Sequence, residues 1–193
     1  MTHAVGTKRN NDVQDVMIET PRLLLRPWRE SDLPLFAELN GDPVVMRMLR
    51  GVLTRAESDA YAARAEQHWA EYGFGKWAVE APGVAPLIGS VGLSHVRFEA
   101  SFTPAVEIAW RLHRPYWGHG YATEAARAAL KDGFDRIGLE EVVAFTALGN
   151  IASAKVMERL GMTRSIEFDH PSIPEGHTLR RHILYRLPRT AFG

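Results

Sequence analysis

Residues 114–124 read Arg-Pro-Tyr-Trp-Gly-His-Gly-Tyr-Ala-Thr-Glu, a glycine turn that leads from a strand into the start of a helix. Gly118 and Gly120 allow the backbone to turn sharply and to approach a ligand closely, because glycine has no Cβ. The first turn of a helix offers unpaired N–H groups and the positive end of the helix dipole. This arrangement suits a pyrophosphate, although Gly-x-Gly alone is equally typical of a plain tight turn.

Two other phosphate-binding loops do not fit the same residues. The turn contains no Gly-Lys-Ser or Gly-Lys-Thr, so it lacks the lysine and hydroxyl with which a P-loop holds a terminal phosphate and its magnesium. The third glycine of a dinucleotide-binding fingerprint is also absent. A nucleotide-binding enzyme is therefore the weakest of the interpretations considered for this chain.

The elements on either side of the turn are the clearest in the sequence. In Val106–Leu112, large apolar residues alternate with polar or small ones, which is the pattern of a strand with one buried face. Over residues 122–137, apolar residues recur at helical spacing, and most of them are alanine. A helix with such a face can pack very close to a sheet.

The remaining segments predict a mixed α/β layer fold with one central, mostly antiparallel sheet. Thr54 and Glu57 form a capping-box pattern, and Ser31 and Asn150 are candidate N-caps of two other helices. Expected strands cover residues 22–28, 77–80, 86–96, 106–112, 142–147, 164–168 and 182–187, and expected helices begin near residues 31, 54, 122 and 150.

Length and composition indicate one soluble domain. The 193 residues fit a flexible arm at 1–16, a domain at 17–189 and a short tail at 190–193. Lys plus Arg and Asp plus Glu each total 23, so nothing in the net charge indicates a nucleic-acid or membrane partner. Cysteine is absent, no signal peptide is recognisable, and no apolar run approaches the ~20 residues of a membrane span. We expect a cytoplasmic protein.

Residues 117–125, Trp-Gly-His-Gly-Tyr-Ala-Thr-Glu-Ala, closely resemble the coenzyme-binding segment of the GNAT N-acetyltransferase superfamily, in particular its RimJ/RimL branch. Residues 19–28 are similar to the opening strand of that branch, 106–110 to its central strand and 150–162 to its second coenzyme segment. The resemblance covers nearly all of residues 17–187. It implies a GNAT-type fold with helices on both faces of a sheet that splays at the coenzyme site, and an enzyme that moves an acetyl group from acetyl-CoA to an amine.

By this resemblance acetyl-CoA is a cosubstrate that is held largely by backbone N–H groups. Many family members carry Gln or Arg where this chain has Pro115, which leaves the role of the preceding Arg114 open. The residues expected to bind the coenzyme are Trp110, Leu112, Arg114, Trp117, Gly118, His119, Gly120, Tyr121, Ala122, Thr123, Asn150 and Ser153.

The family reaction is the attack of a primary amine on the thioester carbonyl through a tetrahedral intermediate. The resemblance places the thioester against the end of Val106–Leu112, where a bulge is expected to free backbone N–H groups. The amide of Leu112 is the candidate donor to the oxyanion. The pantetheine arm is expected to pass between this strand and residues 142–147, which splay apart.

Glu107 is the first candidate for the general base, acting directly or through a water, because it points away from the apolar face of its strand. A substrate anchor and a structural ion pair with Arg111 on the same face remain as alternatives. His95 and His170 are weaker candidates, since a lone histidine near a strand is more often a hydrogen-bonded structural residue.

The residue that protonates the leaving thiolate is not evident. Many family members use a tyrosine in the second coenzyme helix, but no tyrosine occurs between Asn150 and Met162. Ser153 can hold the sulfur or a bridging water, or can simply cap the helix with Asn150, which is itself expected both to cap and to bind pantetheine. Glu124, in the first turn of its helix, is best interpreted as structural.

Several alternatives stay open. His170, His177 and His182 fit no standard zinc spacing, so no metal is expected. The acceptor can be a protein N-terminus, a small polyamine-like amine or an aminated antibiotic. A non-catalytic acyl-CoA-binding or sensor domain is the main alternative function. The loops at 97–104 and 169–181 can close the acceptor site or form a homodimer contact.

Overall fold

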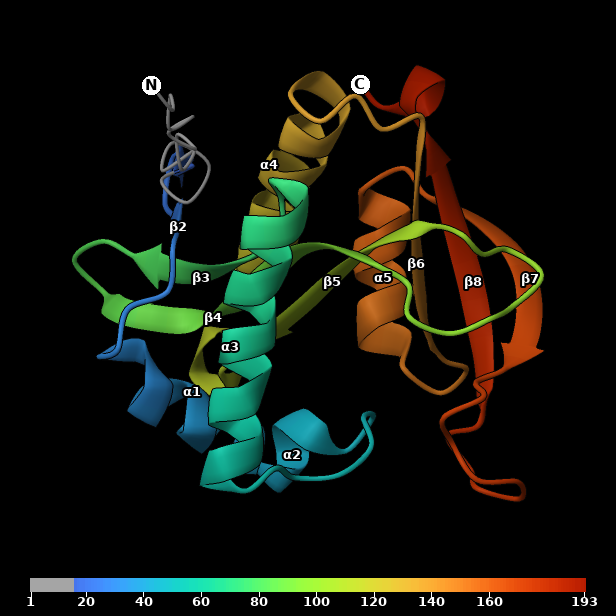
Figure 1. Ribbon diagram of the computed structural model, residues 1–193, viewed down its shortest axis with the longest axis horizontal. Coiled ribbons are helices and arrows are strands. Elements are labelled where there is room, and N and C mark those ends of the chain that lie inside the picture. The colour runs from blue at the N-terminus through green and yellow to red at the C-terminus, as the bar shows by residue number, and fades with distance from the viewer. Residues whose placement is uncertain (1–15) are drawn as a thin grey trace, which may run out of the picture.

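The computed structural model describes residues 16–193, so the predicted arm lies outside the described residues except for Val16. The protein is built on one eight-stranded sheet with the strand order β1-β2-β3-β4-β5-β6-β8-β7 (Figure 1). All neighbouring strands are antiparallel apart from β5 and β6, which are parallel. The predicted mixed α/β fold with a mostly antiparallel sheet is confirmed.

The elements follow the order expected from the sequence, with an extra short strand and an extra short helix in the N-terminal part. The strands are β1 (Ile18–Glu19), β2 (Leu24–Arg26), β3 (Lys76–Ala81), β4 (Ala85–His95), β5 (Val106–Leu112), β6 (Glu141–Ala147), β7 (Thr163–Asp169) and β8 (Arg181–Pro188). The helices are α1 (Asp32–Gly41), α2 (Pro43–Met46), α3 (Arg55–Tyr72), α4 (Tyr121–Asp135) and α5 (Ile151–Arg159), with 3-10 turns η2 (Arg114–Tyr116) and η3 (Arg189–Ala191).

Helices cover both faces of the sheet. Successive residues of a strand point to opposite faces, and β3 shows which helices share a face. Trp77 and Val79 pack in one cluster with α4, whereas Ala78 packs in another cluster with α1 and α3.

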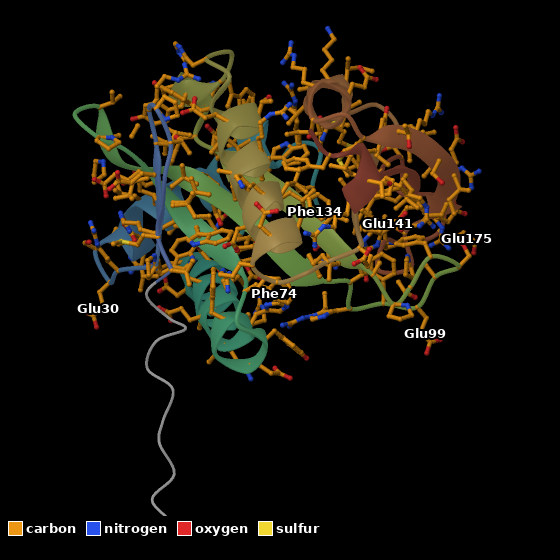
Figure 2. All side chains as sticks on the ribbon, turned by 90° about the horizontal axis from the view of Figure 1, so that it is seen from above. Glu30, Phe74, Glu99, Phe134, Glu141 and Glu175 are labelled. Carbon is orange, nitrogen blue, oxygen red and sulfur yellow. The ribbon has the colours of Figure 1, made fainter. Side chains whose placement is uncertain are left out.

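Helix α4 lies very close to the sheet, as its alanine-rich face predicts. Ala125 and Ala129 are completely buried, and Phe134 on the same helix is 1% exposed (Figure 2). A Cβ on Gly133 would lie 2.6 Å from the Leu93 side chain of β4, so a larger residue there would push the helix away. Near the C-terminus, Phe192 packs on Phe134 with ring centres 5.1 Å apart. No helix of the described chain is long and apolar enough to cross a membrane.

Helix α1 begins differently from the prediction. Ser31 makes no capping hydrogen bond through its side chain, so the predicted cap is wrong. Asp32, the first residue of the helix, bonds to the turn that precedes it, because its carboxylate accepts from the backbone N–H of Arg29 at 2.8 Å. The same carboxylate forms a bidentate pair with the buried Arg26, at 2.7 and 2.8 Å, and Arg26 also donates to Glu80 at 2.7 Å. This network joins β2, α1 and β3.

Two other helix starts can be compared with the sequence pattern. The capping box of Thr54 and Glu57 at α3 is confirmed in both of its hydrogen bonds. Helix α2 was not predicted from the sequence. Asp42 caps this helix, accepting from the N–H groups of Val44 and Val45.

Replacement of Asp32 by alanine should destabilise the fold by about 3–5 kcal/mol, because it leaves the Arg26 guanidinium buried without its main partner. Chemical denaturation monitored by fluorescence measures the loss. Asp59→Ala is the matched control, since Asp59 forms an exposed ion pair with Arg55 within α3 and should cost no more than ~0.5 kcal/mol. Equal losses in the two variants would contradict the role given to the buried network.

Candidate active site

Strands β5 and β6 share a single bridge, between Glu107 and Val143, and then separate. β6 continues with β8, with which it pairs along its whole length, while β5 stays paired with β4 along its whole length. The edge of β5 beyond Glu107 therefore has no strand beside it. This is the splayed sheet that the family resemblance implies.

The N–H groups of Trp110 and Leu112 face the opening between the two strands. In an antiparallel pair, the N–H groups of every second residue point to the same neighbouring strand. The N–H of His113 donates to the Ile88 carbonyl of β4 at 2.9 Å, which fixes the alternation along β5. The N–H groups of residues 107, 109 and 111 thus point to β4, and those of 108, 110 and 112 point to β6. The predicted bulge is wrong, because β5 pairs with β4 without a register shift. The departure of β6 frees these amides instead.

A cavity of about 350 Å³, called the donor cavity below, lies at this end of β5 between α2, the glycine turn and the start of α5. Of the residues assigned to the coenzyme from the sequence, only Arg114 and His119 do not line it. Arg47, Lys155 and Arg159, which were not assigned to the coenzyme from the sequence, also line the cavity and suit phosphate groups. The assigned residues that line the cavity are Trp110, Leu112, Trp117, Gly118, Gly120, Tyr121, Ala122, Thr123, Asn150 and Ser153.

The glycine turn is fixed against the end of β5. Gly118 and Gly120 both have φ = +80°, a conformation that favours glycine. A Cβ on Gly118 would meet no atom within 4 Å, so the backbone angle and not crowding requires glycine there. The Trp117 indole N–H donates to the Leu112 carbonyl at 2.8 Å. Within the described chain, the N–H groups of residues 118–123 donate to no backbone carbonyl, which leaves them available to an anion.

The segment before β2 holds the turn and α4 in place. The Arg22 guanidinium donates to the His119 carbonyl at 2.9 Å and to the Glu124 carboxylate at 2.7 Å. Glu124 also accepts from the Thr20 hydroxyl at 2.7 Å and from the Arg22 N–H at 3.0 Å. Burial opposes the charge of Glu124, but these hydrogen bonds outweigh burial and lower the pKa of Glu124. The structural interpretation of Glu124 agrees with these contacts.

The start of α5 is capped as predicted. Asn150 accepts from the Ser153 N–H at 3.3 Å, and its amide nitrogen donates to the Ser153 hydroxyl at 3.0 Å and to the Thr146 hydroxyl at 2.8 Å. Since the Ser153 oxygen accepts from Asn150, its own O–H remains free to donate. Both residues line the donor cavity, so the capping role does not compete with a role toward a ligand.

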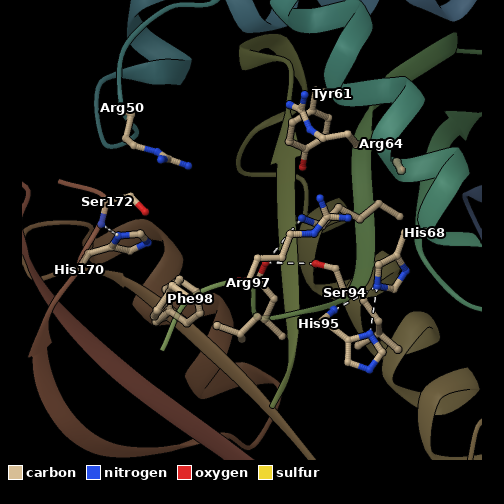
Figure 3. A pocket seen from close by; sticks show the side chains of 16 residues that line it. Arg50, Tyr61, Arg64, His68, Ser94, His95, Arg97, Phe98, His170 and Ser172 are labelled. Carbon is tan, nitrogen blue, oxygen red and sulfur yellow. Dashed lines mark hydrogen bonds and ion pairs between the residues drawn. The ribbon is translucent and has the colours of Figure 1, made fainter. Parts of the chain in front are cut away.

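A second cavity of about 350 Å³, called the acceptor cavity below, lies beside α3 (Figure 3). Glu107 lines it, and its carboxylate accepts from the Ser94 hydroxyl at 3.1 Å and lies 3.7 Å from the Lys76 ammonium. The alternative of an ion pair between Glu107 and Arg111 is wrong, since Glu107 lies beside Lys76 and Arg111 donates to Asn40. Glu107 is thus a partly exposed carboxylate held by a lysine and a serine.

Tyr61 and Lys76 belong to this site, although no sequence motif marks either residue. The Lys76 ammonium lies 5.5 Å and the Arg111 guanidinium 5.2 Å from the centre of the Tyr61 ring. Burial would raise the pKa of Tyr61, but the two cations outweigh it and lower that pKa. Burial opposes the charge of Lys76 in turn, but Tyr61 and Glu107 raise the pKa of Lys76.

His95 is part of a hydrogen-bonded pair, as expected for a structural histidine. The His68 Nδ1 lies 2.7 Å from the Phe74 carbonyl, which can only accept, so Nδ1 carries the proton and Nε2 accepts from the His95 N–H at 3.2 Å. Burial is the main cause that lowers the pKa of His68. This histidine is therefore neutral near pH 7.

His170 lines the acceptor cavity from the loop between β7 and β8 and is 9% exposed. Burial, with the charges of His182 and Arg50, lowers the pKa of His170 to about 4. A group with that pKa is a weak base at neutral pH. In residues 16–193 no group of three His, Asp or Glu side chains is arranged to hold a metal ion.

Comparisons with known proteins agree with this geometry. The sequence profile of the acetyltransferase (GNAT) domain matches residues 22–163. The chain is 33% identical over 162 residues to the uncharacterized N-acetyltransferase YnaD of Bacillus subtilis, which covers 83% of this chain and 89% of YnaD. It is 29% identical over 178 residues to the FsC-acetyl coenzyme A-N(2)-transacetylase of Aspergillus fumigatus, with 82% of this chain and 72% of that protein covered.

Solved structures show the same fold. A GNAT-family acetyltransferase from Bacillus anthracis superposes with a TM-score of 0.74 at 26% identity, covering 91% of this chain and 99% of that one. RimL, a ribosomal-protein acetyltransferase solved in complex with coenzyme A, has the same fold with a TM-score of 0.72 at 18% identity, covering 90% and 98%. The chain belongs to the GNAT acetyltransferase family. It is an acyl-CoA-dependent N-acetyltransferase.

Replacement of Gly118 by aspartate should weaken coenzyme A binding at least ~100-fold, because a carboxylate would face the anionic pyrophosphate at the turn. Isothermal titration calorimetry measures the affinity. Gly138→Asp is the matched control, since Gly138 has φ = +77° and open space around it but lies outside both cavities. Equal affinities in the two variants would remove the glycine turn from the coenzyme site.

The stability of the fold should fall as the pH drops from about 6.5 to about 4, in part through His170. The unfolded chain binds a proton near the free histidine pKa of about 6.5, whereas folded His170 does so near 4, so the folded state loses up to about 3 kcal/mol across this window and nothing above it. His170→Asn should flatten the dependence of the unfolding free energy on pH, measured by denaturant titrations.

His177→Asn is the control for this measurement. The exposed His177 accepts a similar backbone hydrogen bond, from Leu179 at 3.1 Å, as His170 does from Ser172 at 3.2 Å. The slope of stability against pH should stay at the wild-type value in the control. A His170 variant with the wild-type slope would show that this histidine does not contribute.

Proposed function

We propose that the protein transfers the acetyl group of acetyl-CoA to a primary amine by direct attack of the amine on the thioester. The observation that carries this proposal is that the donor and acceptor cavities are both lined by β5. Trp110 and Leu112 line the donor cavity, and Glu107 lines the acceptor cavity from the same strand. A thioester held at the point where β5 and β6 separate would be within reach of an amine in the acceptor cavity.

The donor site is assigned mainly to backbone groups. The free N–H groups of residues 118–123 would bind the pyrophosphate, with Arg47, Lys155 and Arg159 as further cations around it. The pantetheine arm, which contains amides, would lie along the open edge of β5 beside Asn150. RimL, which has this fold, was solved in complex with coenzyme A, and this supports the binding of the coenzyme by this fold.

The reaction requires three events at the reacting atoms. The amine nitrogen forms a bond to the thioester carbonyl carbon, and Glu107 takes a proton from the amine directly or through a water. The N–H of Leu112 stabilises the oxyanion, and the N–H of Trp110 points into the same opening. The intermediate then collapses, the carbon–sulfur bond breaks, and the thiolate takes up a proton. Ser153, with its O–H free to donate, would hold the sulfur or a water beside it.

Release of the coenzyme A thiol from acetyl-CoA, measured across a panel of amines and peptide N-termini, tests the proposal. We expect at least one primary amine to give thiol release together with an N-acetylated product identified by mass spectrometry. Tight binding of coenzyme A without acetylation of any amine or peptide would contradict the proposal and favour a non-catalytic acyl-CoA-binding role.

Glu107→Gln should lower kcat about 100-fold or more while it leaves coenzyme A affinity within about twofold, because the amide cannot take a proton from the amine. The dependence of kcat on pH should also change. Glu141→Gln, which alters a carboxylate of β6 that is paired with Arg186 outside both cavities, serves as the control. A pH–rate profile identical to that of the wild type in Glu107→Gln would remove Glu107 as the base.

A further inference from the structure

The acceptor cavity is strongly cationic, although the whole chain has a formal net charge of zero. Four side chains with a full positive charge line the cavity, against the single carboxylate of Glu107. One of the cations, Lys76, is engaged with that carboxylate at 3.7 Å. The other three are Arg50, Arg64 and Arg97.

These three arginines have no carboxylate partner in the part of the chain that the structure describes. None of them takes part in an ion pair, whereas most ion pairs of the described residues contain one of the other arginines. All three are exposed at the cavity, so their charges remain available to a molecule that enters it. The positive charge of the cavity is therefore not neutralised by the protein.

The arginines come from different elements and lie around the opening. Arg50 belongs to the segment between α2 and α3, on the side of His170 and Ser172, whereas Arg64 belongs to α3 and Arg97 follows β4 (Figure 3). The positive charges of two of these arginines also affect nearby histidines. Burial and the charge of His182 are the larger causes that lower the pKa of His170, and Arg50 adds to them. Burial is likewise the main cause that lowers the pKa of His68, and His95 and Arg97 add to it.

We infer that the acceptor is an amine that also carries an anionic group, a carboxylate or a phosphate, which Arg50, Arg64 and Arg97 bind while the amine lies at Glu107. This inference rests on the proposed function and names the substrate class of the same site. Guanidinium groups suit both kinds of anion, because their N–H groups match the oxygens of carboxylates and phosphates. Glu107, the single carboxylate of the cavity, is then available to the amine.

The same charges disfavour acceptors with several positive groups. A polyamine or an aminated sugar would bring a second ammonium into a cavity where cations outnumber carboxylates, and like charges repel across such distances. The polyamine-like and antibiotic acceptors that the sequence left open are therefore set aside in favour of amino acids, acidic peptide N-termini or phosphorylated amines.

Four amines with the same three-carbon spacer test the inference on the full-length protein. These are 4-aminobutanoate, 3-aminopropylphosphonate, 3-amino-1-propanol and 1,3-diaminopropane. We expect kcat/KM for one of the two anionic amines to exceed that for the neutral alcohol about tenfold or more, and the diamine to be the poorest. The carboxylate and phosphonate arms identify which anion the site prefers. A diamine or an alcohol as the best acceptor would overturn the inference.

The double variant R64Q/R97Q should reduce the preference for the anionic amine about tenfold through KM, since each exposed charge pair typically supplies a factor of about two to five. Coenzyme A affinity should not change. Arg55→Gln is the control, because Arg55 is also on α3 but is paired with Asp59 outside the cavity. Retention of the wild-type preference in the double variant would overturn the inference.

Equilibrium binding separates this inference from the proposed function. The four amines are titrated into the protein saturated with coenzyme A, so the result does not depend on turnover. If no amine releases thiol, the proposed function fails, while tighter binding of an anionic amine than of the alcohol and the diamine still supports the inference. Equal binding of all four amines overturns the inference even if one of them is acetylated.

Discussion

The parting of β5 and β6 after one bridge is the constraint on which the rest of the site depends. A strand edge with free N–H groups inside a protein is costly unless another group bonds to it. Here β6 stays paired with β8 along its whole length, while its other edge meets β5 at a single bridge and then turns away from it. The open edge of β5 therefore offers backbone donors to a molecule with amide and carbonyl groups, as the coenzyme has. Binding of the donor then depends on the fold more than on particular side chains.

The edge of β5 and its two faces present different groups, because backbone N–H groups lie at the edge and side chains alternate between the faces. The N–H groups of Trp110 and Leu112 lie at the edge, whereas the side chains of Glu107 and Arg111 point to the α3 face. In the proposed function, donor recognition and acceptor recognition thus use different parts of one strand.

Much of this could be predicted from the sequence, where the signal is local. The glycine turn, the alanine-faced helix and the Asn150 cap were recognisable because their chemistry lies within a few consecutive residues. The capping role assigned to Ser31 is wrong, and the local pattern could not show that the neighbouring Asp32 is bound by Arg26 of β2. Lys76 was missed as the partner of Glu107, and Arg111 was considered in its place, for the same reason. The contacts of both residues depend on how separate elements pack.

The cationic character of the acceptor cavity was also hidden in the sequence. Arg50, Arg64 and Arg97 are separated along the chain and balanced by acidic residues elsewhere, so neither net charge nor any local run reveals them. Only the packing of α3 and two loops around β5 brings them together. A composition with zero net charge is therefore compatible with a strongly charged site.

The central claim is that the open edge of β5 and the glycine turn together bind the coenzyme. Titration of coenzyme A into isotope-labelled protein, followed by amide NMR, tests it most directly. The account predicts that the largest shifts of amide signals occur at Trp110, Leu112 and residues 118–123. Amide shifts confined to other regions, with those of Trp110, Leu112 and the turn unchanged by saturating coenzyme A, would contradict it.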